Sequence, residues 1–386
     1  MSADKSPFFK SRLMTPGPTD VPPGVLSEMA QPIIHHRTKA FQEIFADLSQ
    51  RLQRLFRTEN PVLTIAGSGT TAFEASQASL TKPGDKALSI ASGKFGERWQ
   101  DVFDQYGIDQ IKIDVPWGDA VTVDQVKQAF EAHPEISVVT AVHSETSTAT
   151  ACDMKAIAEF VSTTNALLIV DGITAVGALP VEMDAWGIDV LITGSQKAMM
   201  LPPGLGFVGL GKRAVKRLGE TPAGNYYNLD LRKWLKSWEK NDVPFTPPVS
   251  LIRGQRVALE MVEDRGLENV WSCTAQLATA SRAAFEAMGL KLISSSPSDS
   301  VSGAYYPDGV DDSIRKSLRE KHGISIAGGQ NGRGADWKGK IFRINHMGFV
   351  DAGDTLSTLH ALETEFIAAG LTIEPGTALK TAAQHL

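Results

Sequence analysis

The sequence predicts an α/β fold with a large, mostly parallel sheet, followed by a smaller C-terminal α+β domain. Between residues 61 and 210, short apolar runs alternate with segments whose apolar residues recur at helical spacing. Continuous apolar runs of this kind are typical of parallel strands that helices cover on both faces. The chain has 386 residues, of which 42% are hydrophobic, and this exceeds one ordinary domain. Two domains are therefore expected.

The first 20 residues are predicted to form an extended arm, because Thr15-Pro16-Gly17-Pro18-Thr19 is unfavourable for a helix. A helix is predicted next, since a set of apolar residues lies on one face at 3.6-residue spacing. This set is Phe41, Ile44, Phe45, Leu48, Leu52, Leu55 and Phe56.

The predicted strands of the sheet are the apolar runs 61–66, 86–91, 136–142, 166–170, 190–193 and 205–210. The predicted helices between them cover 72–80, 95–106 and 154–162. In such a sheet, ligands bind beyond the carboxyl ends of the strands. Four polar residues lie just past these ends, namely Ser68, Thr146, Asp171 and Lys197. Their shared position predicts the functional site.

The alternation of strands and helices weakens near residue 215, in a segment that contains Trp234 and Trp238. A helix is predicted over 251–265, and Gly266 is suited to end it as a C-cap. We place the domain boundary there, which predicts an arm (1–20), a large domain (21–265) and a small domain (266–386).

Composition argues against several classes of function. The net charge is −6 without a strong block of either sign, so no nucleic-acid partner is expected. No apolar stretch is long enough to span a membrane, and residues 1–10 lack the core of a signal peptide, so a cytoplasmic protein is expected. Cys152 and Cys273 do not suit a disulfide framework or an iron–sulfur cluster. His35 and His36 are adjacent and lack a third ligand, so no metal site is predicted.

Asp171 and Lys197 form the most informative pair in the sequence. Asp171 ends an apolar run, and Lys197 follows the next apolar run in Gly194-Ser195-Gln196-Lys197. Pyridoxal phosphate needs a lysine amine for its Schiff base and a carboxylate that keeps its pyridine nitrogen protonated. Apolar surroundings disfavour the charge of a lysine and make its amine more nucleophilic. The pair therefore predicts a pyridoxal phosphate site.

Four further positions in the sequence are compatible with this site. Gly67-Ser68-Gly69-Thr70 lies between a strand and a helix, and suits either a bound anion or an ordinary turn. It is neither a dinucleotide-binding nor an ATP-binding glycine motif. Phe95 suits ring stacking or core packing, and the hydroxyl of Thr146 suits a ring oxygen or a turn. Arg343, flanked by apolar residues, needs a partner such as a substrate carboxylate or a structural acid.

These segments together resemble fold-type I, class V aminotransferases, in particular the alanine/serine–glyoxylate aminotransferase group. The resemblance covers nearly the whole chain in order. The matching segments are Thr15-Pro16-Gly17-Pro18, Gly67-Ser68-Gly69-Thr70, His143-Ser144-Glu145-Thr146-Ser147-Thr148, Val170-Asp171, Gly194-Ser195-Gln196-Lys197, Pro202-Pro203-Gly204, Gly266-Leu267-Glu268-Asn269 and the Arg343 region.

The resemblance implies pyridoxal phosphate as cofactor and a role for each matching residue. Lys197 would be the Schiff-base lysine and proton shuttle, and Asp171 would pair with the ring nitrogen. The phosphate would be held by Ser68, Gly69, Thr70 and Gln196, together with Thr246 of the neighbouring subunit of a homodimer. Phe95 would stack on the ring where close relatives carry a tryptophan, Thr146 would reach the ring hydroxyl or nitrogen region, and Arg343 would bind the substrate carboxylate.

The implied reaction is ping-pong transamination from a small L-amino acid, alanine or serine, to glyoxylate or pyruvate. Aspartate stays open as a donor, because Arg37, Arg253 or Arg333 could serve a second carboxylate. The related pyridoxamine–pyruvate aminotransferase is the closest alternative, but it takes free pyridoxal, whereas the phosphate-binding residues are kept here. Cysteine desulfurase would need a cysteine on a loop of the small domain. A non-catalytic subunit, the label of some relatives in soluble hydrogenases, would not need Lys197, Asp171 and Arg343.

Overall fold

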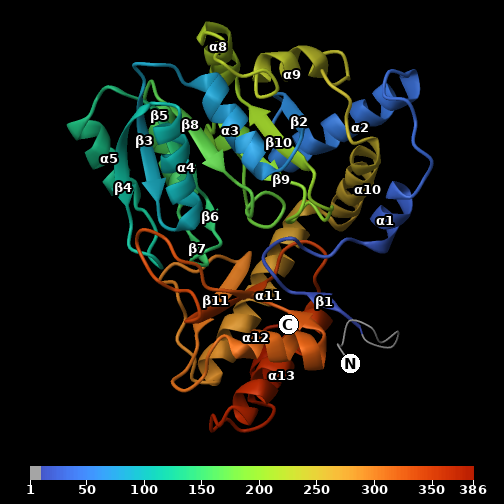
Figure 1. Cartoon of the computed structure of the whole chain (residues 1–386), viewed down its shortest axis with the longest axis vertical. Helices are drawn as coiled ribbons and strands as arrows, with labels where there is room; N and C mark the ends of the chain where they lie inside the picture. The colour runs from blue at the N-terminus through green and yellow to red at the C-terminus, as the bar shows by residue number, and fades with distance from the viewer. Residues whose placement is uncertain (1–9) are drawn as a thin grey trace.

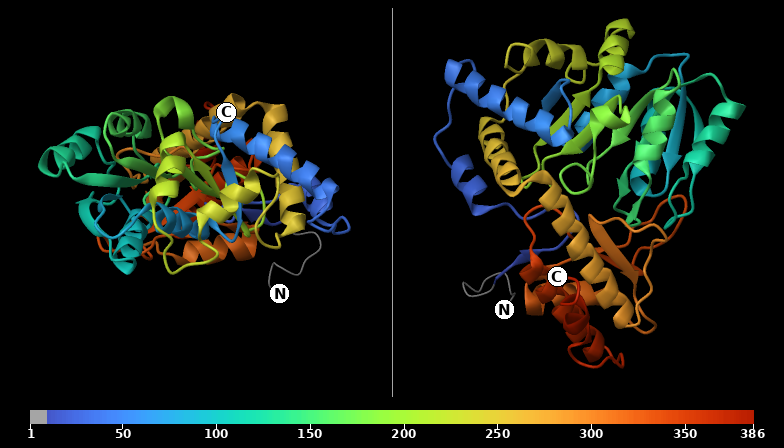
Figure 2. Two further views of the ribbon diagram at one scale, coloured as in Figure 1. Left: turned by 90° about the horizontal axis from the view of Figure 1, so that it is seen from above. Right: turned by 180° about the vertical axis from the view of Figure 1, so that it is seen from behind.

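The computed structural model describes residues 10–386. Residues 1–9 lie outside the described residues, so the first part of the predicted arm and most of the segment that lacks a signal-peptide core are not covered. A large sheet with helices on both faces forms one part of the molecule, and a smaller part follows from α11 to the C-terminus (Figures 1 and 2). None of the described helices combines the length and the apolar character needed to cross a membrane.

Within residues 10–386, the central sheet has seven strands in the order β2, β10, β9, β8, β5, β3, β4. Their bounds are β2 Val62–Ala66, β3 Lys86–Ala91, β4 Asp109–Asp114, β5 Ile136–Val142, β8 Leu167–Asp171, β9 Val190–Gly194 and β10 Leu205–Leu210. The pairs from β4 to β9 are parallel, whereas β10 is antiparallel to both β9 and β2. The predicted mostly parallel α/β sheet is confirmed.

The reversal at β10 follows from the length of its connection. A parallel crossover needs a dozen or more residues, usually with a helix. The loop from Gly194 to Leu205 has no helix, and so the chain turns back beside β9. This short loop carries Lys197 and holds it at the edge of the sheet.

Helices cover the sheet at the positions that the periodicity predicts. Further helices are present that the sequence pattern did not predict. The helices of this part are α1 Pro23–Met29, α2 Lys39–Phe56, α3 Gly69–Leu80, α4 Lys94–Gln105, α5 Val123–Ala132, α6 Met154–Ser162, α7 Met183–Trp186, α8 Lys212–Glu220, α9 Leu231–Trp238 and α10 Val249–Arg265. The strand β4 and helix α5 were not predicted. β4 is an edge strand in which Asp109, Lys112 and Asp114 are exposed, so it lacks a continuous apolar run.

The second part is built on a three-stranded sheet of β11 Val301–Tyr305, β14 Ile341–Asn345 and β13 Ala327–Gly328. Its helices are α11 Leu267–Ala287, α12 Ser313–Ser317, the π-helix Leu318–His322, α13 Ala352–Ala368 and α14 Thr377–Ala382. The helix α10 ends at Arg265 as predicted, and Gly266, at φ +82°, turns the chain directly into α11.

Each part has its own apolar core. The core of the large sheet includes α2 and α10, and a second core joins α11, α13 and β14. The arm also contributes to the second core, because β1 (Arg12–Leu13) pairs with β12 (Ile324–Ser325) and Met14 is buried there. The exact domain boundaries stay a prediction.

Candidate active site

A cavity of about 230 Å³ lies at the carboxyl ends of the strands β5, β8 and β9, beside the first turns of α3 and α4. Among the predicted site residues, those that line it are Gly69, Thr70, Phe95, Thr146, Asp171, Gln196 and Lys197. They come from five separate stretches of chain, which supports the expectation that strand ends gather at one edge.

Lys197 lies three residues beyond β9, and the N-terminal arm covers it. Its Nζ donates to the carbonyl of Pro16 at 2.5 Å, and Thr19 bonds the backbone carbonyls of Gln196 and Lys197 at 3.1 and 2.8 Å. Burial and then the nearby charge of Arg343 lower the pKa of the amine to about 8, against the opposing charge of Asp171. About one tenth of the amine is therefore uncharged at pH 7, against fewer than about one in a thousand at the ordinary pKa of lysine.

Gly17 makes the approach of the arm to the lysine possible. It has φ +126°, and a Cβ there would lie 2.0 Å from Lys197 Nζ. We expect Gly17→Ala to displace the arm from Lys197, with a cost of about 1–3 kcal/mol in folding stability from backbone strain. Urea unfolding and the rate of cofactor capture by Lys197 would show both effects. Gly24→Ala is the matched control, since a Cβ there meets no atom within 4 Å; equal results for the two variants would contradict the prediction.

Asp171 ends β8 and is 4% exposed. Its Oδ1 accepts from the backbone N–H of Ile173 at 3.0 Å, and no hydrogen bond within residues 10–386 uses Oδ2. Burial and the charge of Glu145 raise the pKa of this carboxyl to about 7, against the opposing effects of the Ile173 N–H, Arg98 and Lys197. A cationic partner in the cavity would compensate the buried carboxylate.

The loop before α3 has the features of an anion site. Ser68 caps the helix by accepting from the Thr70 N–H at 3.2 Å, and it is not among the residues that line the cavity. The backbone at Gly69 is tightly placed, because a Cβ there would lie 2.6 Å from the Ile173 side chain. Gln196 Oε1 is buried without a hydrogen-bond partner among the described residues. The backbone N–H of Gly69, which has no hydrogen bond within the described chain, and an uncommitted amide at a helix N-terminus suit a phosphate.

Thr146 and Phe95 are positioned by their neighbour Glu145. The Glu145 carboxylate is 1% exposed and accepts from the N–H groups of Phe95 and Gly96 at 2.9 and 3.0 Å, and from Ser147. Burial raises the pKa of this carboxyl. The hydroxyl of Thr146 makes no hydrogen bond to any residue that the structure describes. Glu145 therefore fixes the first turn of α4, and Thr146 keeps a free polar group at the cavity.

Arg343 lies behind Thr146 on β14 and is 4% exposed. Its guanidinium donates to the carbonyls of Thr146 at 2.5 Å and Gly328 at 2.6 and 3.2 Å, and within the described chain it has no carboxylate partner. Burial lowers its pKa to about 10, and the charge of Glu145 opposes this change. A structural acid was one of the two partners expected for Arg343, and no such acid pairs with it in the described chain. A buried cation without an acidic partner favours binding of an anion.

The remaining predicted residues lie elsewhere. Thr246 is exposed and does not line the cavity of its own subunit. The three other candidate arginines are already paired with acids: Arg37 with Asp242, Arg253 with Glu28 and Arg333 with Asp101.

Several lining residues were missed by sequence analysis. Ser144 and Thr174 follow strand ends and could have been found by the rule that identified Asp171. Arg98 follows Phe95 by three residues, so helical periodicity places it on the same face of α4. The contact of Pro16 with Lys197 has no local sign, because the two residues are 181 positions apart.

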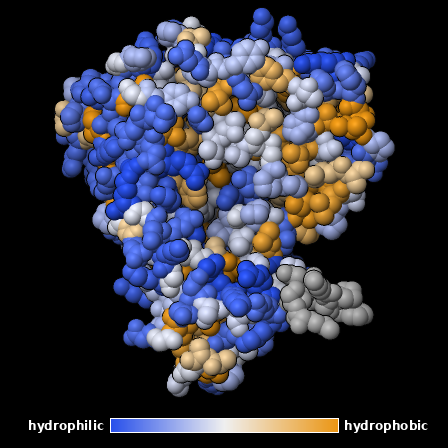
Figure 3. Space-filling model, viewed as in Figure 1, coloured by the Kyte–Doolittle hydropathy of each residue, from blue (hydrophilic) through white to orange (hydrophobic). Residues whose placement is uncertain are grey.

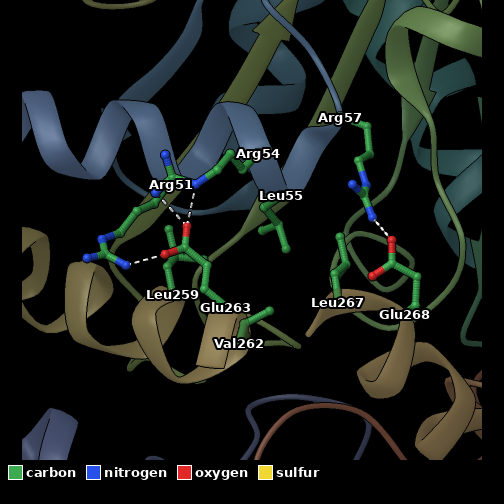
Figure 4. Close-up of a pocket in the computed structure, with 9 residues that line it drawn as sticks. All are labelled: Arg51, Arg54, Leu55, Arg57, Leu259, Val262, Glu263, Leu267 and Glu268. Atoms are coloured by element: carbon green, nitrogen blue, oxygen red, sulfur yellow. Dashed lines mark hydrogen bonds and ion pairs between the residues drawn. The ribbon is translucent and has the colours of Figure 1, made fainter. Parts of the chain in front are cut away.

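A second cavity, of about 380 Å³, lies between α2, α10 and the start of α11 (Figure 4). Its arginines and glutamates pair with one another: Arg51 and Arg54 with Glu263, and Arg57 with Glu268. Because these charges are mutually satisfied and no predicted site residue is present, this cavity does not compete with the cavity at the strand ends.

The donors and acceptors of the strand-end cavity fit a flat, anionic cofactor. Apolar side chains of Phe95 and Ile173 line it together with an acid, an uncommitted hydroxyl and the loop at Gly69. Pyridoxal phosphate presents a matching set, namely an aromatic ring, a ring nitrogen, a ring hydroxyl and a phosphate.

Comparisons with known proteins agree with this chemistry. Residues 13–334 match the family described as Aminotransferase class-V. The chain is 39% identical to an uncharacterized aminotransferase of Methanocaldococcus jannaschii, with 95% of each chain covered. It is 33% identical to an L-aspartate–glyoxylate aminotransferase of Paracoccus denitrificans, with 97% of this chain and 95% of the relative covered. The crystal structure of pyridoxamine–pyruvate aminotransferase from Mesorhizobium loti superposes with a TM-score of 0.92 at 30% identity, with 97% of each chain covered.

The family match covers well over half of the chain, and the relatives cover nearly all of it. The fold, the cavity at the strand ends and the lysine–aspartate pair agree with this assignment. The chain therefore belongs to the class V aminotransferases, enzymes that depend on pyridoxal phosphate.

Proposed function

We propose that this aminotransferase moves the amino group of a small L-amino acid, alanine or serine, to glyoxylate or pyruvate in two half-reactions at one site. The observation that carries the proposal is the meeting of Lys197 and Asp171 in one buried cavity, with Arg343 behind it. The cavity is small, and Arg37, Arg253 and Arg333 are committed to acids, so a second substrate carboxylate lacks a free partner among them. This favours alanine and serine over aspartate.

The cofactor would be held by residues that already line the cavity. Gly69, Thr70 and Gln196 would bind the phosphate, with Ser68 shaping the loop, while Phe95 would stack on the ring and Thr146 would bond a ring substituent. Asp171 would hold a proton on the ring nitrogen. These roles are supported by the uncommitted polar atoms of Gln196, Thr146 and Asp171.

The cofactor, when bound, supplies a protonated ring that takes up the electron pair left when a proton leaves the substrate α-carbon. The chain's own residues perform the remaining work. Lys197, with its pKa lowered to about 8 by burial, can take the proton from the α-carbon and deliver it to C4′ of the cofactor. Arg343 would orient the α-carboxylate of both substrates in turn. The carbonyl of the arm residue Pro16 accepts a hydrogen bond from the lysine amine and holds it in place.

A homodimer would complete the phosphate site through Thr246 of the neighbouring subunit. Thr246 is exposed, as such a contact requires, and precedes the buried Pro247. Figure 3 shows apolar side chains gathered on the face that carries α1 and α10, and Leu26 and Ile33 in this region are 49% and 73% exposed. Exposed apolar side chains gathered on one face are typical of a subunit interface. A cytoplasmic location is proposed on the sequence arguments given above.

Arg343→Lys is expected to raise KM for the amino donor and for the oxo acid by about 30-fold each. The lysine keeps the charge but loses the bidentate hydrogen bonding to a carboxylate, and this bidentate geometry contributes about 2 kcal/mol to binding. Steady-state kinetics with both substrates varied would measure the effect. The control is Arg319→Lys on the exposed π-helix. A rise for one substrate only would contradict a shared carboxylate site.

The visible absorbance of the purified protein tests the proposed function. We expect a band from cofactor joined to Lys197, its loss on addition of L-alanine or L-serine, and its return with glyoxylate or pyruvate. Loss of the band only with L-aspartate, and not with L-alanine or L-serine, would correct the substrate class. Loss of the cofactor on dialysis, with turnover of added free pyridoxamine and pyruvate, would favour the reaction of the Mesorhizobium loti enzyme.

A further inference from the structure

Arg98 is a cation of the cavity to which neither the family resemblance nor the predicted site gave a role. It lies in the second turn of α4, its guanidinium carbon is 4.9 Å from the centre of the Phe95 ring, and its Nη1 donates to Thr70 Oγ1 at 3.2 Å. Phe95, Thr70 and Arg98 all line the same cavity. One side chain thus joins the ring on α4 to the loop that begins α3.

The charge of Arg98 is not neutralised by a nearby acid. No ion pair within residues 10–386 includes Arg98. The flanking acids are engaged by Arg333, because Glu97 accepts its backbone N–H at 2.8 Å and Asp101 pairs with its guanidinium. The guanidinium therefore adds a full positive charge next to the partial positive charge at the N-terminus of α3.

The turn that carries Arg98 cannot easily move. Glu145 holds the N–H groups of Phe95 and Gly96. A Cβ at Gly96 would lie 2.5 Å from Ala91 Cα, so α4 packs closely against β3. The position of the guanidinium is thus set before any ligand binds, and preorganised charges contribute most to binding.

We propose that Arg98 is a positioning residue for the cofactor, which holds Phe95 in its stacking orientation and adds its charge to the phosphate-binding loop. This inference rests on the proposed use of bound pyridoxal phosphate. Lys197 and Arg98 are the only cations that line the cavity within the described chain, and Lys197 is needed for the chemistry. The charge of Arg98 also lowers the pKa of both Asp171 and Lys197.

Arg98→Met removes the charge while keeping an apolar side chain over Phe95. We expect its dissociation constant for pyridoxal phosphate to rise about 10- to 100-fold, as for loss of one charge-assisted contact. The dissociation constant for free pyridoxal, which has no phosphate, is expected to change far less. Both constants follow from titration of the visible band without any substrate. The pH midpoint of that band is expected to rise in Arg98→Met and to return toward the wild-type value in Arg98→Lys.

Two controls keep the test decisive. Arg319→Met removes an exposed arginine that has no acidic partner in the described chain, and should leave both constants unchanged. The melting temperature of cofactor-free Arg98→Met should match that of the wild type, which separates positioning from a folding defect. An equal rise in the dissociation constants for pyridoxal phosphate and pyridoxal, or no change in either constant, would overturn the inference. A wild-type protein without any visible band would instead overturn the proposed function.

Discussion

Lys197→Ala is expected to lower kcat/KM for transamination by about 10⁴-fold or more. The substitution removes the amine that is proposed to capture the cofactor and to move the substrate proton, and each of these contributions is large. Since Lys197 Nζ donates to the Pro16 carbonyl, the variant also loses a contact between the arm and the sheet. Initial rates with saturating cofactor would measure the loss, and the visible band should be absent.

The pH dependence of cofactor capture gives a second measure of Lys197. Only the uncharged amine reacts, and burial, followed by the charge of Arg343, lowers its pKa to about 8. The capture rate of the cofactor-free wild type should therefore rise between pH 7 and 9 and level off above. A rise centred above pH 10, near the ordinary value for lysine, would show that the amine is not buried as described.

The matched control for Lys197→Ala is Lys216→Ala, because the Lys216 side chain is 78% exposed on α8. Its activity and visible band should equal those of the wild type. Retention of full activity in Lys197→Ala would reject the proposed role of this lysine, whatever the control shows.

Asp171→Asn is expected to lower kcat by about 10²- to 10³-fold, with a smaller effect on KM. The amide is nearly the same size but cannot hold a proton on the ring nitrogen, so the loss is one of charge stabilisation in the transition state. Stopped-flow measurement of each half-reaction would detect it. Asp184→Asn, at the surface near Thr58, is a control that also removes a hydrogen-bonded aspartate.

Although Asp171→Asn is expected to lower activity, it should raise the folding stability of the cofactor-free protein. Burial, together with the charge of Glu145, raises the pKa of Asp171 to about 7 in the folded protein, against about 4 in the unfolded chain. The folded state therefore binds the proton more tightly, and stability falls as pH rises from 4 to 7. The loss approaches about 4 kcal/mol at pH 8. Cofactor-free Asp171→Asn should thus be more stable than the wild type at pH 8, and this difference should shrink toward pH 4.

Urea unfolding of both cofactor-free proteins at several pH values would test this prediction. Addition of pyridoxal phosphate should stabilise the wild type more than Asp171→Asn, because only the carboxylate gains a cationic partner in the ring nitrogen. A difference in stability that does not vary with pH would contradict the raised pKa.

Much of the fold was predictable because local pattern and tertiary arrangement agree. The apolar runs that became β3, β5 and β10 were predicted with the bounds that the structure has, and so was α6. The antiparallel direction of β10 was not predicted, since it depends on the helix-free loop that carries Lys197. The edge strand β4 was missed because half of its residues face solvent and its pattern resembles a loop.

The sequence by itself determined which residues stand at the carboxyl ends of the strands, and hence that Asp171 and Lys197 share one edge of the sheet. It could do so because strand periodicity is local and parallel strands bring their ends together. Only the tertiary structure decided that the Pro16 carbonyl meets the lysine amine, that Arg343 lacks an acidic partner, and that Arg98 connects Phe95 to Thr70. These contacts join segments far apart in the chain, and their geometry follows from how the whole core packs rather than from any local pattern.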